Sequence, residues 1–124
     1  MLRFTTVDFD EFHNRTLPEG LAAGHGELAG ADVATTDPIA FRVGESAYTY
    51  VPVSGTVELR PGDADAATVV ELDAATFSDY AQELQSCFGL FYGDTARVVR
   101  GSHEHWFRWE PAIRALYHGR PLYD

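Results

Sequence analysis

The sequence of 124 residues contains no lysine and a single cysteine, Cys87. One cysteine excludes an internal disulfide, which suits a reducing compartment such as the cytoplasm. No apolar run approaches the roughly 20 residues that a membrane span needs. The first residues, MLRFTTVDFDEF, have acids where a signal peptide has its apolar region. We therefore expect a cytoplasmic protein without a membrane span, in which Cys87 is a small core residue.

Positive charge is also scarce, and the net charge is −10. Such a chain repels phosphate backbones, so we expect no nucleic-acid partner. The charge is uneven along the chain. Residues 1–93 carry fifteen acids and four arginines, whereas residues 94–124 carry four acids and five arginines.

Recognisable catalytic motifs are absent. The sequence has no Gly-x-Ser-x-Gly elbow, no P-loop and no Gly-x-Gly-x-x-Gly. The densest imidazole cluster is His103-Glu104-His105, but residues two apart do not share a helix face. No His-x-Asp pair starts a two-histidine, one-carboxylate iron site. We expect no catalytic residue, no metal and no cofactor, with His103 and His105 as polar residues in the first turn of a helix.

The length indicates one domain, residues 1–124, and the pattern predicts an α+β fold. A helical segment is expected from Asp8 to Asp32, with a capping box at Thr16-Leu17-Pro18-Glu19. Close approach of its backbone to a sheet would explain its small residues, Gly20, Gly24, Gly26 and Gly30.

Five strands are expected, in an antiparallel or mixed sheet with helices on one face. Short breaks between the first four indicate an antiparallel meander, and Pro52 indicates an edge strand. The predicted strands are Ile39–Val43, Tyr48–Val53, Thr56–Arg60, Thr68–Leu72 and Ala96–Arg100.

Two helices are predicted in the second half. Asp73 caps the first, in which Leu72 and Phe77 form a hydrophobic staple and one apolar stripe runs to Phe88. Ser102 caps the second, which is kinked near Trp109 or split in two at Pro111. Gly119 ends it, and residues 119–124 form a linker.

Nine of the sixteen aromatic residues lie between residues 69 and 118. They fill a core, line a cavity for an apolar ligand, or anchor a protein contact. In the cavity interpretation Arg97, Arg100 and Arg108 would meet an acidic head group. The candidate pocket residues are Phe77, Tyr80, Leu84, Phe88, Trp106, Trp109, Ile113 and Tyr117.

The order of elements after residue 69 resembles the second half of sterol-carrier-protein-2-like domains. The matching segments are Val69–Leu72, Asp73–Phe88, Gly93, Ala96–Arg100, Gly101 and Ser102–His118. The resemblance implies an SCP2-like fold that binds a lipid, sterol or acyl ligand.

Several phrases, among them FDEFHNRTLPE, ELDAATFSDY and WEPAIRALYHGRPLYD, also resemble the N-terminal region of bacterial phytanoyl-CoA-dioxygenase-like proteins. That resemblance implies an accessory domain beside an oxygenase domain, whose metal site is absent here. The leading hypothesis is a non-catalytic carrier or accessory domain. The alternative is a structural or dimerisation module with a filled core and no small-molecule ligand.

Overall fold

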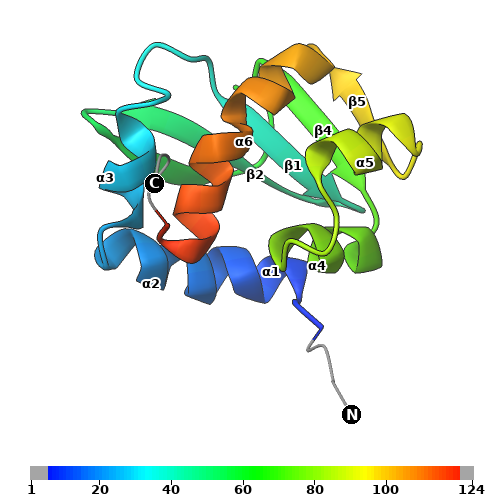
Figure 1. The fold of residues 1–124 in the computed structure, drawn as a ribbon, viewed down its shortest axis with the longest axis horizontal. Coiled ribbons are helices and arrows are strands. Elements are labelled where there is room, and N and C mark those ends of the chain that lie inside the picture. Colours follow the sequence, from blue (N-terminus) through cyan, green and yellow to red (C-terminus); the bar gives the residue numbers. More distant parts are fainter. Residues whose placement is uncertain (1–5, 121–124) are drawn as a thin grey trace.

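The computed structural model describes residues 6–120 as an α+β fold with one five-stranded sheet (Figure 1). Four short helical segments precede the first strand, and three helices follow or flank the last two strands. The elements are α1 (Phe9–Glu11), the π-helix η1 (Phe12–Thr16), α2 (Leu17–Ala22), α3 (His25–Gly30), β1 (Ile39–Val43), β2 (Ser46–Val53), β3 (Thr56–Pro61), β4 (Thr68–Leu72), α4 (Ala74–Ala81), α5 (Cys87–Tyr92), β5 (Ala96–Arg100) and α6 (His103–His118).

The sheet has the order β3-β2-β1-β4-β5 and is mixed. Strands β1, β2 and β3 form the expected antiparallel meander, and β5 is antiparallel to β4. The meander prediction is wrong for β4, which pairs with β1 in parallel. Residues 62–67 cross the sheet and lead the chain from β3 to β4. Hydrogen bonds hold this loop: Thr49 Oγ1 donates to the Gly62 carbonyl, and Arg100 donates to the Asp63 and Ala66 carbonyls.

Pro52 does not mark an edge strand, because β2 lies between β3 and β1. The register explains why proline is tolerated there. Pairing of β1 with β2 ends at Ile39 and Tyr50, so at Pro52 only β3 is a neighbour. The strand is therefore central, but its end beyond Tyr50 behaves locally like an edge.

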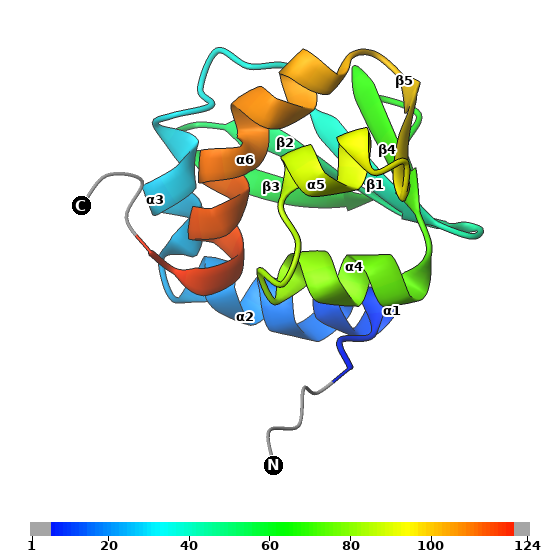
Figure 2. The ribbon, with the colours of Figure 1, turned by 45° about the vertical axis from the view of Figure 1, so that its right-hand side comes forward.

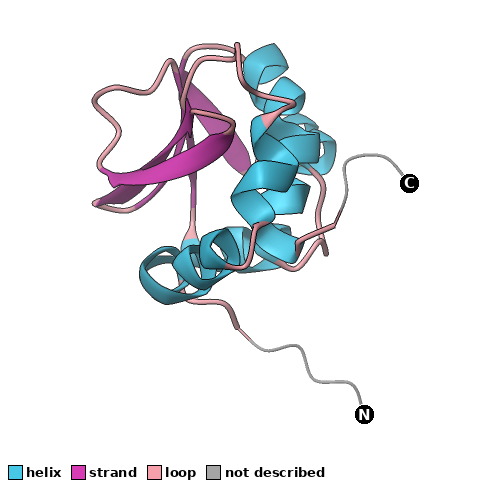
Figure 3. Ribbon diagram, turned by 90° about the vertical axis from the view of Figure 1, so that its left-hand side faces the viewer, coloured by secondary structure: helices cyan, strands magenta, loops and turns pink. Residues whose placement is uncertain are grey.

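The helices form a second layer on one face of the sheet (Figure 3), as predicted. α6 lies across that face and packs against α2, α3 and α5 (Figure 1). α4 lies next to α1, and α5 next to α6 and β5 (Figure 2). Within the described residues, no helix is long and apolar enough to cross a membrane.

Two of the four glycines, Gly26 and Gly30, let the N-terminal helices approach the sheet, whereas a Cβ on Gly20 would meet His25 and Gly24 has a left-handed φ of 101°. A Cβ on Gly26 would overlap the Thr56 side chain, and one on Gly30 would overlap the carbonyl group of Gly55. The prediction of a capping box at Thr16 is wrong, since Thr16 has helical backbone dihedrals and its side chain makes no capping hydrogen bond. The helical path already runs through it from Phe9.

The predicted helix from Asp73 to Phe88 is broken in two. Asp73 does cap α4, accepting a hydrogen bond from the Thr76 amide, and Phe77 is fully buried. Beyond Ala81, however, Glu83 has a left-handed φ of 62°, and Ser86 caps the separate helix α5. The prediction of a single buried apolar stripe is therefore wrong at its C-terminal end, where Leu84 and Phe88 are 44% and 54% exposed.

α6 is one helix, which excludes the alternative that it is split in two at Pro111. Ser102 caps its first turn, and Gly119 ends it in the left-handed region, both as expected. Pro111 removes one intrahelical hydrogen bond. Continuous burial of the helix face offsets that loss, and Trp106, Trp109 and Ile113 are at most 1% exposed. Of the predicted linker 119–124, residues 121–124 lie outside the described residues.

Candidate functional site

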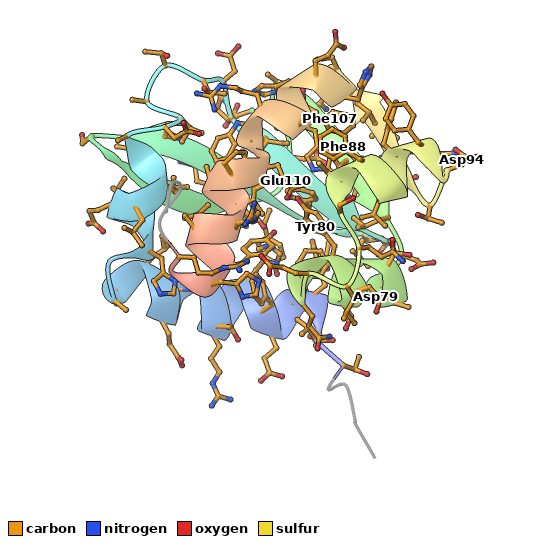
Figure 4. The ribbon with its side chains drawn as sticks, in the orientation of Figure 1. Asp79, Tyr80, Phe88, Asp94, Phe107 and Glu110 are labelled. Carbon is orange, nitrogen blue, oxygen red and sulfur yellow. The ribbon has the colours of Figure 1, made fainter. Side chains whose placement is uncertain are left out.

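A pocket of about 320 Å³ opens between the connection from α4 to α5 and the C-terminal half of α6. Its walls come from the break in the predicted helix and from one face of α6. Figure 4 shows Tyr80 and Glu110 close together in the space between these helices. The lining residues are Tyr80, Glu83, Gln85, Ser86, Cys87, Phe88, Glu110, Ile113, Arg114, Tyr117, His118 and Arg120.

A carboxylate with two protein donors lines the pocket. Tyr80 Oη donates to Glu110 Oε1 at 2.9 Å, and the Cys87 amide donates to Glu110 Oε2 at 3.2 Å. Trp106 Nε1 in turn donates to Tyr80 Oη at 3.3 Å. Burial, reinforced by the negative charge of Glu110, holds the pKa of Tyr80 well above its ordinary value, so its proton stays on the hydroxyl.

Cys87 is a structural residue. Its side chain is fully buried, as predicted from the sequence. Burial and the neighbouring Glu110 raise the pKa of the Cys87 thiol far above its ordinary range. A thiol that stays protonated is a poor nucleophile, so this group offers no nucleophilic chemistry.

Charged side chains surround the pocket mouth and converge on Glu83. Arg114 Nε lies 3.6 Å and His118 Nε2 lies 3.9 Å from Glu83 Oε1, and Arg120 pairs with the same oxygen. The left-handed backbone of Glu83 places this carboxylate beside the end of α6. The two arginines at the mouth therefore already have an acidic partner, and burial lowers the pKa of His118, which favours its neutral form.

Four of the eight predicted pocket residues line this pocket, namely Tyr80, Phe88, Ile113 and Tyr117. Three others, Phe77, Trp106 and Trp109, are fully buried in the core and are not among the lining residues. Leu84 is exposed and also lies outside the lining. Ligand binding by these residues stays a prediction.

The arginines expected to meet a head group lie elsewhere. Arg97 pairs with Glu71 at 3.1 Å, and Arg108 pairs with Asp32 at 2.7 Å. Arg100 donates to backbone carbonyls of the loop that precedes β4. None of the three lines the pocket. The arginines that do line it are Arg114 and Arg120.

Glu110 is one of the pocket residues that were not predicted from the sequence. It lies four residues after Trp106 and three before Ile113, so it belongs to the buried face of α6. A carboxylate on an otherwise apolar stripe was the available signal. Glu83 and Cys87 gave no comparable signal, because a break between α4 and α5 brings them to the pocket.

A second buried network connects the N-terminal helices, the sheet and α6. His13 Nδ1 lies 2.8 Å from the Phe9 carbonyl, which can only accept, so Nδ1 carries the proton. Tyr50 Oη, 2.7 Å away, must then donate to His13 Nε2, and Tyr117 Oη donates to Tyr50 Oη at 2.5 Å. Burial lowers the pKa of His13 to about 4, which keeps the ring neutral.

A cluster of aromatic rings reaches the surface on α5 and the first turns of α6. Phe88 contacts Phe107 with ring centroids 4.5 Å apart, and Phe91 stacks on His103 at the same distance. Tyr92 joins the cluster and is 71% exposed. These five residues, which we call the α5 aromatic surface, meet the pocket at Phe88.

The other histidine of the predicted cluster has a structural role. His105, in the first turn of α6, bonds to Thr68 Oγ1 at 2.6 Å and to the Asp37 carbonyl at 2.8 Å. Among residues 6–120, no group of three or more His, Cys, Asp or Glu side chains is arranged to hold a metal ion.

Comparison with known proteins identifies the fold. No protein-family model matches the sequence, and no curated protein matches it. Solved structures do match: sterol carrier protein 2 from Yarrowia lipolytica in its apo form superposes with a TM-score of 0.68 at 12% identity, covering 94% of this chain and 99% of that one. The fold is sterol-carrier-protein-2-like.

Two further solved structures match this chain. Another sterol carrier protein 2 gives a TM-score of 0.64 at 12% identity, covering 86% of this chain and 94% of that one. An inverting sec-alkylsulfatase from a Pseudomonas species gives 0.53 at 13% identity, with 67% of this chain aligned to only 13% of that chain. The SCP2-like resemblance is thus confirmed for the fold, whereas none of these matches is a phytanoyl-CoA dioxygenase.

Proposed function

We propose that this chain is a non-catalytic binding domain that holds a small apolar or amphipathic ligand in the pocket between α5 and α6. The observation that carries the proposal is the pocket itself. It is lined mainly by apolar surface, with Phe88, Ile113 and Tyr117 as its walls, and it opens to solvent beside Glu83. A largely apolar concavity with a few convergent polar groups is the usual form of a small-molecule site.

The size of the pocket limits the ligand. About 320 Å³ lies at the lower end of the roughly 300–1,000 Å³ typical of small-molecule sites. A short acyl or alkyl chain suits this volume better than a whole sterol. The SCP2-like fold supports a carrier function, since two of the similar structures are named sterol carrier proteins.

The test compares two exposed aromatics of α5, of which only one lines the pocket. Phe88→Ser removes an apolar wall, and Tyr92→Ser is the matched control on the same helix. A fluorescent probe with a short alkyl chain and an uncharged head group should bind the wild type saturably, lose affinity with Phe88→Ser and keep it with Tyr92→Ser. Native mass spectrometry of the purified protein would show any retained ligand. No probe binding at micromolar protein would contradict the proposal.

The α5 aromatic surface favours a second candidate, an interaction module that dimerises or positions a neighbouring domain. Exposed aromatic rings are favoured anchors of protein contacts. The alignment to a small part of the alkylsulfatase chain is consistent with an accessory position beside an enzyme domain. The comparisons lend no support to an oxygenase as that neighbour.

The two candidates predict different responses to the same variants. Self-association through the α5 aromatic surface should weaken with both Phe88→Ser and Tyr92→Ser, because both rings are exposed. Sedimentation velocity at several protein concentrations would measure this. A monomer at all concentrations would contradict dimerisation. The α5 aromatic surface could then act only by binding a different protein or domain.

A further inference from the structure

We infer that Glu110 determines ligand specificity, selecting amphiphiles whose polar group donates hydrogen bonds, such as primary amines and alcohols, over carboxylic acids. This inference rests on the proposed function of the same pocket. It concerns the one charged group of the pocket that has hydrogen-bond donors but no cation beside it.

The carboxylate of Glu110 has unused accepting capacity. Oε1 accepts from Tyr80 Oη and Oε2 accepts from the Cys87 amide. An ionised carboxylate has about four lone-pair sites, so these two donors and the weakly donating thiol of the neighbouring Cys87 still leave it incompletely satisfied. Because Glu110 lines the pocket, the remaining capacity is available to a bound ligand.

The charge of Glu110 is not neutralised by a neighbouring cation. Within residues 6–120, no arginine or histidine lies within 4.0 Å of its oxygens, and Arg114, one turn later on α6, pairs with Glu83 instead. His118 and Arg120 also face Glu83. The arginines at the mouth are thus paired with Glu83, whereas the charge of Glu110, inside the pocket, has no paired cation.

The surroundings of Glu110 make this charge selective. Ile113, Phe88 and the rings of Tyr80 and Tyr117 form apolar walls around it. A second negative charge placed beside this carboxylate is unfavourable. A protonated amine would form a charge-assisted hydrogen bond with Glu110, an alcohol would form a weaker one, and a carboxylate would be repelled.

Three eight-carbon probes with different head groups test the inference. Octylamine, octan-1-ol and octanoate are titrated at pH 7 against the wild type by isothermal calorimetry. Octylamine should bind about tenfold more tightly than octanoate, with octan-1-ol between them. Tighter binding of octanoate would overturn the inference and assign the head group to the arginines at the mouth.

Variants of the same helices isolate the role of the charge. Glu110→Gln should reduce the preference for octylamine over octanoate by about tenfold, because an amide keeps an acceptor but loses the charge. Glu104→Gln, an exposed carboxylate on α6, makes the same change in net charge and should leave the preference unchanged. An unchanged preference in Glu110→Gln would overturn the inference.

Tyr80→Phe provides a second variant should Glu110→Gln fail to fold. It removes the donor to Oε1 and should keep or increase the preference for octylamine, whereas a reversed preference would overturn the inference. Binding of all three probes without any preference would refute the specificity alone. Binding of none would refute the proposed function as well.

Discussion

The hydroxyl of Tyr117, near the end of α6, donates a 2.5 Å hydrogen bond to the hydroxyl of Tyr50 in the middle of the sheet. The hydroxyl of Tyr50 in turn donates a hydrogen bond to His13 in the N-terminal π-helix. Three segments far apart in the sequence are therefore joined by one buried chain of donors and acceptors. Within the described residues, no buried side-chain nitrogen or oxygen is left without a partner.

We expect Tyr50→Phe to lower the free energy of unfolding by about 1–3 kcal/mol, because it leaves His13 Nε2 without a donor in a buried site. Tyr48→Phe is the matched control, since its hydroxyl bonds to Asp10 at the surface and its loss should cost less than about 1 kcal/mol. Urea denaturation measures both. An equal loss in the two variants would contradict the proposed importance of the buried chain.

Stability should fall between pH 6.5 and pH 4 because of His13. Its pKa is about 4 in the folded protein and 6.5 in the unfolded chain, so only the unfolded chain takes up a proton in this interval. The stabilisation is fully present above pH 6.5, and its loss by pH 4 is on the order of 3 kcal/mol.

His13→Gln removes this titration. Urea denaturation across the pH range should therefore show a shallower decline for the variant than for the wild type, whatever its stability at pH 7. All other titratable groups are the same in both proteins, so their contributions cancel in the comparison. Parallel curves would show that His13 does not carry the pH dependence.

Gly30→Ala should destabilise the protein by about 1–3 kcal/mol, because the added methyl group overlaps the backbone of Gly55, which must then shift. Gly89→Ala is the control. Its new Cβ would meet only the side chains of Gln85 and Ser86 at 3.3 and 3.5 Å, and helix propensity favours alanine there by about 1 kcal/mol. Thermal unfolding that ranks the two variants in the opposite order would contradict the close packing of α3 on the sheet.

Much of the fold follows from local sequence signals. The strands Ile39–Val43, Thr68–Leu72 and Ala96–Arg100 begin and end at the predicted residues. Asp73 and Ser102 cap helices because their side chains reach amides three residues later. These signals act within a few residues, so they are readable without knowledge of the tertiary structure.

Features of the fold that depend on contacts between distant residues could not be predicted from the sequence. The parallel pairing of β4 with β1 follows from a loop that crosses the sheet, which strand periodicity does not encode. The break at Glu83 contains neither glycine nor proline, so propensity favours a continued helix there. Because that break builds one wall of the pocket, Glu83 and Cys87 could not be placed there from the sequence, whereas Glu110 on the buried face of α6 could have been.

The most direct test of the central claim is to map a bound ligand by amide chemical shifts. In an NMR titration of the isotope-labelled protein with octan-1-ol, we expect saturable shifts in two segments, residues 83–88 and 110–118, which line the pocket. The edge strand β3 should not respond. Saturable shifts confined to Tyr92 and His103, or no saturable shift up to the solubility limit of the alcohol, would contradict a ligand pocket between α5 and α6.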